Sequence, residues 1–241
     1  MEAGKKVIYC SGPMFSPEDR WGMQQIATTC EAAGYLTYLP QRDGMELGPL
    51  VNLLRSHLFE VVLEATVLRN VGLWMMQLGF ALDIYQLHGR CDGVVFNMNG
   101  RVPDDGSVME ASSAYTAGKP LVVYKETPVT LLSSGFDNPM IQGMAASWKY
   151  AGSMSDLAPM LHAEFTRTAS SDAYTFVPPA HLKRVIELGA KVWAGDEVVT
   201  FLRKLHGHQA NAADLVAISH WLAKNSSMIT DVFAAHADTP A

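Results

Sequence analysis

The acidic residues of the segment DDGSVME, residues 104–110, carry the clearest chemical signal in this sequence. We expect a helix to begin near Gly106, which places Glu110 in about its first turn, where the helix N-terminus favours an ionised carboxylate. An ionised carboxylate that is held rigidly can act as a nucleophile. Asp104 precedes this helix and Asp92 begins the strand before it, so both are candidate acids or bases. One nucleophile with such partners is the minimum set for cleaving a glycosidic bond with retention.

The elements expected around these residues follow a strand–helix–strand order. Residues 7–10 form a short β-prone run, and Tyr9 within it is placed to donate its hydroxyl to Glu110 and orient it. The residues SPED at 16–19 put Ser at the N-cap, Pro at the first helical position and acids in the first turn, which predicts a helix to about Ala33. A second strand at 35–39 completes a βαβ opening.

The rest of the chain divides into a sheet region and a helical tail. Further strands are predicted at 93–96, 121–124 and, as a short last one, 148–150, which gives an α/β domain over residues 1–165 with a parallel five-stranded sheet flanked by helices. Between 47 and 88 we expect two long helices, with a break near 70–72. Residues 166–179 are rich in Ser, Thr, Ala and Pro and are expected to be a linker, and residues 180–241 keep helical spacing and form a helical C-terminal extension.

Ligands of doubly wound sheets bind beyond the carboxyl ends of the strands. Three segments should therefore meet there: residues 9–15, residues 92–110 and residues 137–140. Each signal taken alone also has a purely structural explanation. An acid in a first helical turn stabilises the helix, Asp104 to Gly106 is typical of a turn with a cap, and Tyr9 on a strand is most often a packing residue.

Composition excludes several classes of protein. Hydrophobic residues make up 49% of the 241 residues and charged residues 17%, so the chain is expected to fold. The net charge of −6 argues against a nucleic acid polymer as partner. Three scattered cysteines, without a CxxC pair, support neither a zinc knuckle nor a disulfide framework. The most apolar stretch, residues 71–87, is too polar to span a membrane, and the N-terminus does not resemble a signal peptide, so we expect a soluble cytoplasmic protein.

Four motifs in sequence resemble those of the nucleoside 2-deoxyribosyltransferases. The resemblance covers roughly residues 5–165, and the motifs have the expected order and sensible spacing. The matching segments are YCSGPMFS at 9–16, CDGVV at 91–95, the D-x-G-x-x-x-E pattern from Asp104 to Glu110, and the N-x-M pattern from Asn138 to Met140.

The resemblance implies a Rossmann-like, flavodoxin-like fold and transfer of 2-deoxyribose between purine or pyrimidine bases through a covalent deoxyribosyl-Glu intermediate. It implies no metal and no organic cofactor. The implied partners are deoxyribonucleosides and free nucleobases, and a homo-oligomer is implied as well. The residue roles carried over are Glu110 as nucleophile, Tyr9 as the group that orients it, Asp92 and Asp104 as groups that bind the base and handle its proton, Phe15 as an aromatic stacked near the base, Asn138 as a sugar contact commonly made across a subunit interface, and Gly12 and Met140 as further substrate-binding residues.

Two alternatives stay open at the level of the sequence. The first is a hydrolase of 2-deoxynucleoside 5′-monophosphates, which would use the same Glu and Asp but pass the sugar to water; that group typically has Ser where Asn138 stands. The second is a non-catalytic nucleotide-sensing module with a helical effector tail. One departure from the transferase pattern is plain, because EASSA follows from Glu110 where the family often has E-x-G-Y-A.

Overall fold

The computed structural model describes residues 4–57, 65–99, 103–132, 135–170 and 176–234. The chain divides into two compact units. The sheet unit comprises Met1–Leu39 with Arg90–Val177, and the helical unit comprises Pro40–Gly89 with Pro178–Ala241. This division differs from the boundary expected at residue 165, because the helices in the middle of the chain group with the C-terminal helices.

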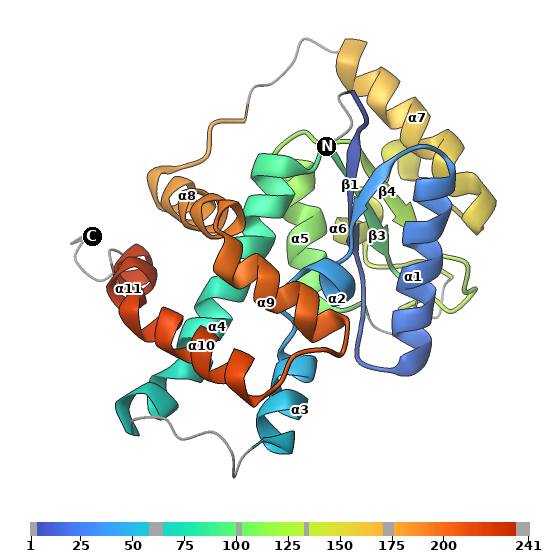
Figure 1. The fold of residues 1–241 in the computed structure, drawn as a ribbon. Helices are drawn as coiled ribbons and strands as arrows, with labels where there is room; N and C mark the ends of the chain where they lie inside the picture. The colour runs from blue at the N-terminus through green and yellow to red at the C-terminus, as the bar shows by residue number, and fades with distance from the viewer. Residues whose placement is uncertain (1–3, 58–64, 100–102, 133–134, 171–175, 235–241) are drawn as a thin grey trace. The chain divides into compact units, whose positions relative to one another are not determined.

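The sheet unit is built on a parallel sheet of four strands in the order β2-β1-β3-β4 (Figure 1). The α/β class with a parallel sheet flanked by helices is therefore confirmed, and the expected fifth strand at 148–150 is wrong. Ser147 and Trp148 adopt φ angles of +54° and +59°, which an extended strand does not allow, and only Ala151 makes an isolated parallel bridge to Tyr124. The strands are β1 (Val7–Ser11), β2 (Leu36–Tyr38), β3 (Gly93–Asn97) and β4 (Leu121–Tyr124).

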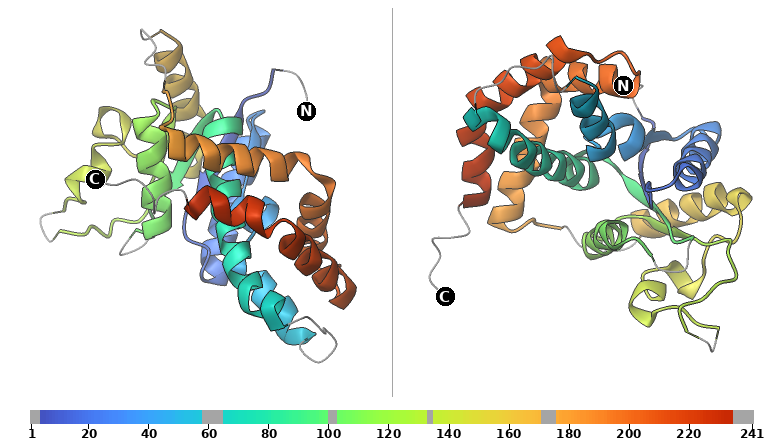
Figure 2. Two further views of the ribbon diagram at one scale, coloured as in Figure 1. Left: turned by 90° about the vertical axis from the view of Figure 1, so that its left-hand side faces the viewer. Right: turned by 90° about the horizontal axis from the view of Figure 1, so that it is seen from below.

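Helices cover the two faces of this sheet. α1 (Pro17–Ala32) and α7 (Met154–Ser170) pack against each other on one face, and α5 (Asp105–Thr116) lies on the other (Figure 1, Figure 2). Because side chains alternate along a strand, Ile8 and Cys10 enter the core under α1, whereas Tyr9 and Ser11 face α5. Two short turns, α6 (Pro139–Gln142) and η2 (Ala146–Trp148), follow β4.

The predicted start of α1 is confirmed in detail. The Ser16 hydroxyl accepts a hydrogen bond from the Asp19 N–H, the Asp19 carboxylate accepts one from the Ser16 N–H, and Pro17 is the first helical residue. This reciprocal cap satisfies two N–H groups that the helix itself leaves unpaired. The helix ends before Gly34, whose φ of +92° suits a glycine.

The helical unit is formed by two stretches of chain that lie far apart in the sequence. Gly189 of α8 meets α4 so closely that a Cβ atom there would fall 2.1 Å from the carbonyl oxygen of Ala81. α4 also runs unbroken through residues 70–72, where a break was expected. The elements are α2 (Pro40–Asp43), α3 (Leu47–Ser56), α4 (Ala65–Tyr85), the π-helical turn η1 (Gln86–Arg90) that follows α4 in the chain, α8 (Ala180–Ala194), α9 (Asp196–His206), α10 (Ala212–Lys224) and α11 (Ser226–Ala234).

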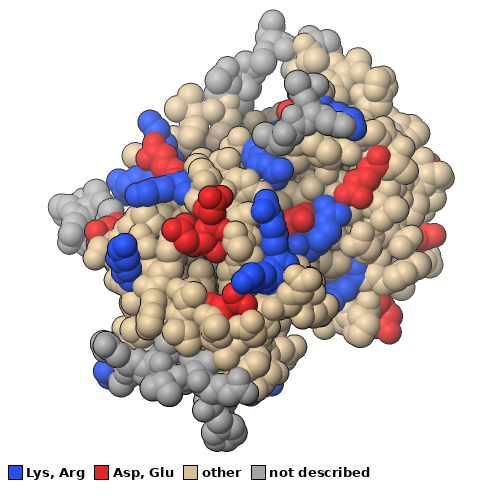
Figure 3. All heavy atoms as spheres, viewed as in Figure 1, with Lys and Arg blue, Asp and Glu red and all other residues tan. Residues whose placement is uncertain are grey.

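The linker expected at 166–179 is partly helical, because α7 continues to Ser170. Residues 171–175 lie outside the described residues, and α8 begins at Ala180, as expected for the first helix of the tail. Within the described parts of the chain, no helix is both long and apolar enough to cross a membrane. On the face shown in Figure 3, basic and acidic side chains are interspersed.

Candidate active site

A carboxylate held by two hydroxyl groups lies between β1 and α5. The Tyr9 hydroxyl donates to Oε1 of Glu110 at 2.7 Å, and the Ser11 hydroxyl donates to Oε2 at 2.6 Å. Both donors belong to β1 and are fully buried, whereas Glu110 is only half-buried. Both oxygens of the carboxylate are therefore fixed by a rigid strand, and the expected hydrogen bond between Tyr9 and Glu110 is present.

Ser11 was not among the residues predicted from the sequence. The sequence does contain a pattern that predicts its role. Ser11 follows Tyr9 by two positions on the same strand, so the two side chains point to the same face of the sheet. A buried serine in an otherwise apolar strand needs a hydrogen-bond partner, and here the partner is Glu110.

Asp104 caps α5 and is linked to the same cluster. Its Oδ2 accepts hydrogen bonds from the backbone N–H and the hydroxyl of Ser107, and the Ser107 carbonyl oxygen lies 3.4 Å from the Ser11 hydroxyl. α5 begins at Asp105, so Glu110 stands in the second turn and not in the first. Its carboxylate is therefore oriented by side-chain hydroxyls rather than by the free N–H groups of the helix end.

Asp92 does not join this cluster. Its Oδ2 accepts the Val7 N–H at 2.8 Å and its Oδ1 pairs with the Lys6 ammonium at 2.9 Å, which places it at the amino ends of β1 and β3. The expectation that Asp92 faces the crevice at the carboxyl ends is wrong. The physical reason is its place before β3, because a five-residue strand of roughly 16 Å separates it from that edge.

Gly12 and Phe15 follow β1. A Cβ atom at Gly12 would fall 2.3 Å from Met23 Sδ and 2.7 Å from Asn97 Cβ, so close packing at the end of the strand requires a glycine. Phe15 is 82% exposed. Their expected contacts with a substrate stay predictions.

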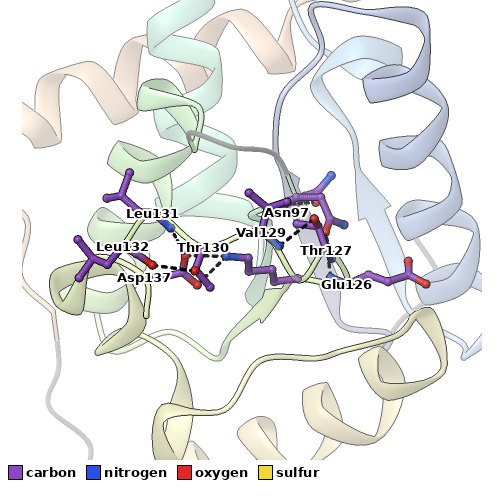
Figure 4. A network of polar contacts seen from close by, with 10 residues as sticks. Asn97, Glu126, Thr127, Val129, Thr130, Leu131, Leu132 and Asp137 are labelled. Atoms are coloured by element: carbon purple, nitrogen blue, oxygen red, sulfur yellow. Dashed lines mark hydrogen bonds and ion pairs between the residues drawn. The ribbon is translucent and has the colours of Figure 1, made fainter. Parts of the chain in front are cut away.

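The segment that carries Asn138 is anchored by a buried ion pair. The Lys125 ammonium lies 2.6 Å from both carboxylate oxygens of Asp137, and dashed lines mark these contacts at Asp137 in Figure 4. Both side chains are about 95% buried. Lys125 directly follows β4, and Asn138 caps α6 by accepting the Met140 N–H at 3.0 Å. The ion pair thus ties the start of α6 to the sheet. Met140, the second residue of α6, is 80% exposed.

A pocket of about 690 Å³ opens at the carboxyl ends of the strands. Asn97 ends β3, and the Asn99 side-chain oxygen accepts the backbone N–H groups of Glu126 and Thr127 at 2.8 and 3.0 Å, which joins the loops after β3 and β4 (Figure 4). The sequence analysis did not single out these asparagines. The pocket is lined by Pro17, Glu18, Asp19, Trp21, Gly22, Asn97, Asn99, Tyr124, Glu126 and Met154.

Tyr124 lines this pocket, and its hydroxyl has a raised pKa. Its hydroxyl donates to Glu126 at 2.6 Å, and burial, followed by the hydrogen bond to Glu126, raises the pKa of Tyr124 from 10.0 to about 12. The folded state therefore favours the protonated phenol, and this contribution to stability is present below pH 10 and lost as the pH rises from 10 to about 12.

The measurement is an ultraviolet titration of phenolate formation in the native protein. Replacing Tyr124 with Phe should remove one group that ionises near pH 12. The same change at Tyr115, which is 56% exposed, serves as the control. A loss of absorbance change near pH 10 in the Tyr124→Phe variant would contradict the shift.

Comparisons with known proteins assign no family to this chain. No protein-family model matches the chain, and no curated protein sequence matches it. Among solved structures, the chain is similar to a conserved protein from Enterococcus faecalis V583 at 18% sequence identity and a TM-score of 0.45, over 66% of this chain and 99% of that one. Among the described residues, no group of three or more His, Cys, Asp or Glu side chains is placed to hold a metal ion.

Proposed function

We propose that this chain transfers 2-deoxyribose between purine or pyrimidine bases, with Glu110 as the nucleophile. The observation that carries the proposal is the pair of hydroxyl hydrogen bonds from Tyr9 and Ser11 to the two oxygens of Glu110. Hydrogen bonds to a carboxylate are charge-assisted and fix its orientation. A carboxylate oxygen carries more than one lone pair, so an oxygen that accepts a hydrogen bond is still able to attack a carbon atom.

The proposed reaction has two steps that share one intermediate. In the first, a Glu110 oxygen forms a bond to C1′ of the deoxynucleoside as the C1′–N bond breaks; the departing base takes the bonding electron pair and a proton from an acid. In the second, the nitrogen of an incoming base attacks C1′, the ester bond returns its electrons to Glu110, and the base releases a proton. Two inversions at C1′ give net retention.

Asp104 is our candidate for the acid and base. It caps the helix that carries Glu110, and Ser107 links it to the same cluster. Asp92 has no part in the proposal, because it lies at the other end of the strands. Asn138 and Phe15 keep their proposed contacts with sugar and base, and the proposal retains a homo-oligomer in which Asn138 acts across the subunit interface.

The test is an exchange assay with the full chain. The protein is mixed with 2′-deoxyinosine and free adenine or cytosine, and the products are separated by chromatography. New deoxyadenosine or deoxycytidine together with hypoxanthine is the expected result, and inosine in place of 2′-deoxyinosine tests the choice of sugar. Release of free deoxyribose without a new nucleoside would assign the hydrolase instead, and binding without turnover would favour the sensing module.

Removal of the Tyr9 hydroxyl should slow exchange. A hydrogen bond to a charged group contributes about 1.5–3 kcal/mol, so Tyr9→Phe should lower kcat/KM by roughly 10- to 100-fold. The matched control is Tyr115→Phe, an exposed tyrosine on the same helix as Glu110. If Tyr9→Phe exchanged bases at the native rate, Tyr9 would have no orienting role.

A further inference from the structure

The pocket at the carboxyl ends of the strands has no part in the proposed reaction. Its walls come from the first two turns of α1, from the ends of β3 and β4 with the residues that follow them, and from the start of α7, on the face of the sheet that α1 and α7 cover. Glu110 is held from the opposite face by Tyr9 and Ser11. We propose that this pocket is a second binding site, for a small, planar, uncharged ligand that carries an amide edge, such as an aromatic carboxamide.

The charge of the walls selects against anions. Glu18, Asp19 and Glu126 line the pocket, and the described residues that line it include no lysine or arginine. Carboxylates accept hydrogen bonds and donate none, so they favour a ligand that presents N–H groups. A carboxylate or phosphate on the ligand would instead meet like charge.

Asn97 supplies the complementary donor. Asn97 is about 95% buried, and its side-chain oxygen Oδ1 accepts a hydrogen bond from the Asn99 backbone N–H at 3.0 Å. Its amide nitrogen finds, among the described residues, only the Sδ of Met23 at 3.4 Å, and a thioether is a weak acceptor. A buried amide N–H with so weak a partner favours a ligand that brings a carbonyl oxygen.

Donor and acceptor together define the ligand's edge. Asn97 offers a hydrogen-bond donor and Glu126 an acceptor to the same pocket, and an amide group carries both the matching acceptor and the matching donor. Trp21 lines the pocket and is 67% exposed, so its indole ring is available for stacking with a planar ligand. A volume of about 690 Å³ is in the range of small-molecule sites.

The experiment is isothermal titration calorimetry of the full chain with nicotinamide and nicotinate. These probes share a ring and differ in the amide and the carboxylate, and neither is a base of the proposed exchange reaction. We expect nicotinamide to bind at least about tenfold more tightly than nicotinate. Nicotinamide bears the amide that the pocket favours, whereas the carboxylate of nicotinate is repelled by the acidic side chains of the pocket. Absence of nicotinamide binding, or equal affinities, would overturn the site.

Variants test which surface binds the probe. Trp21→Ala should weaken nicotinamide about tenfold through lost stacking, whereas Trp148→Ala, also an exposed tryptophan of the sheet unit, should leave it unchanged. Glu126→Gln should narrow the preference for nicotinamide over nicotinate about threefold. The control Asp105→Asn, which changes an exposed carboxylate on α5, should leave the preference for nicotinamide over nicotinate unchanged. Equal effects of the two tryptophan variants would show that the probe binds elsewhere.

This site and the proposed function can fail separately. Loss of exchange activity in every assay would leave the calorimetric result as it stands, because Glu110 does not line the pocket. Conversely, if the protein exchanges bases but binds nicotinamide and nicotinate equally, the proposed active site stands and the proposed second site is refuted.

Discussion

Glu110→Gln is expected to lower deoxyribosyl exchange by roughly four orders of magnitude or more, because a side-chain amide cannot replace a carboxylate as the nucleophile. The fold should survive the change. Glutamine keeps the shape of the side chain, and the hydroxyls of Tyr9 and Ser11 can rotate to accept or donate as the amide requires. The measurement is the initial rate of adenine exchange into 2′-deoxyinosine, with the melting temperature recorded beside it.

The control for this variant is Glu187→Gln, which changes an exposed carboxylate of α8. It should leave the rate unchanged. Intact-mass spectrometry gives an independent readout: the native protein incubated with 2′-deoxyinosine alone should carry a deoxyribosyl adduct, and the Glu110→Gln variant should carry none. A variant with a melting temperature and an exchange rate both near native would rule out Glu110 as the nucleophile.

Lys125→Met is expected to destabilise the protein by about 3–5 kcal/mol, because it leaves the Asp137 carboxylate buried without its partner. The double variant Lys125→Met with Asp137→Leu should recover most of that loss, since replacing both charges removes the unpaired group and keeps an apolar volume. The measurement is the free energy of unfolding in urea, taken for the native protein, both single variants and the double variant.

An exposed ion pair provides the matched comparison. Lys6 and Asp92 lie 2.9 Å apart, but their side chains are 55% and 33% exposed. Lys6→Met should therefore cost less than about 1 kcal/mol. Comparable losses from Lys6→Met and Lys125→Met would show that burial is not what makes the pair at Lys125 important.

Local sequence patterns predicted the parts of the fold that local interactions determine. The cap at Ser16 and the strands around Tyr9 and Val122 follow from residue type and spacing alone. The fifth strand failed because residues 147 and 148 take a left-handed backbone conformation, although the surrounding WKY sequence has β propensity. Periodicity also shows that the helices of residues 47–88 have an apolar face, but it does not show which other helices bury that face.

For the candidate site, too, the sequence predicted what single motifs determine and missed what depends on the arrangement of the whole fold. The pairing of Tyr9 with Glu110 could be predicted because each follows from its own motif, although they are 101 residues apart. The position of Asp92 could not be decided by the motif, because the exact first residue of β3 determines which end of the strand it occupies. The ion pair of Lys125 with Asp137 left no signal in the sequence, since the two residues lie twelve positions apart and only the fold brings their charges together.

The division of the helical unit between two distant stretches affects how the chain is made. Residues 40–89 leave the ribosome well before α8, whose Gly189 packs against Ala81. At about 5–20 residues per second, the wait between the two is roughly 5–20 s. During that interval synthesis of the sheet unit is completed, while α4 still lacks its contacts with α8, α10 and α11. The nascent chain is therefore most exposed to misfolding and to chaperone binding through its middle helices.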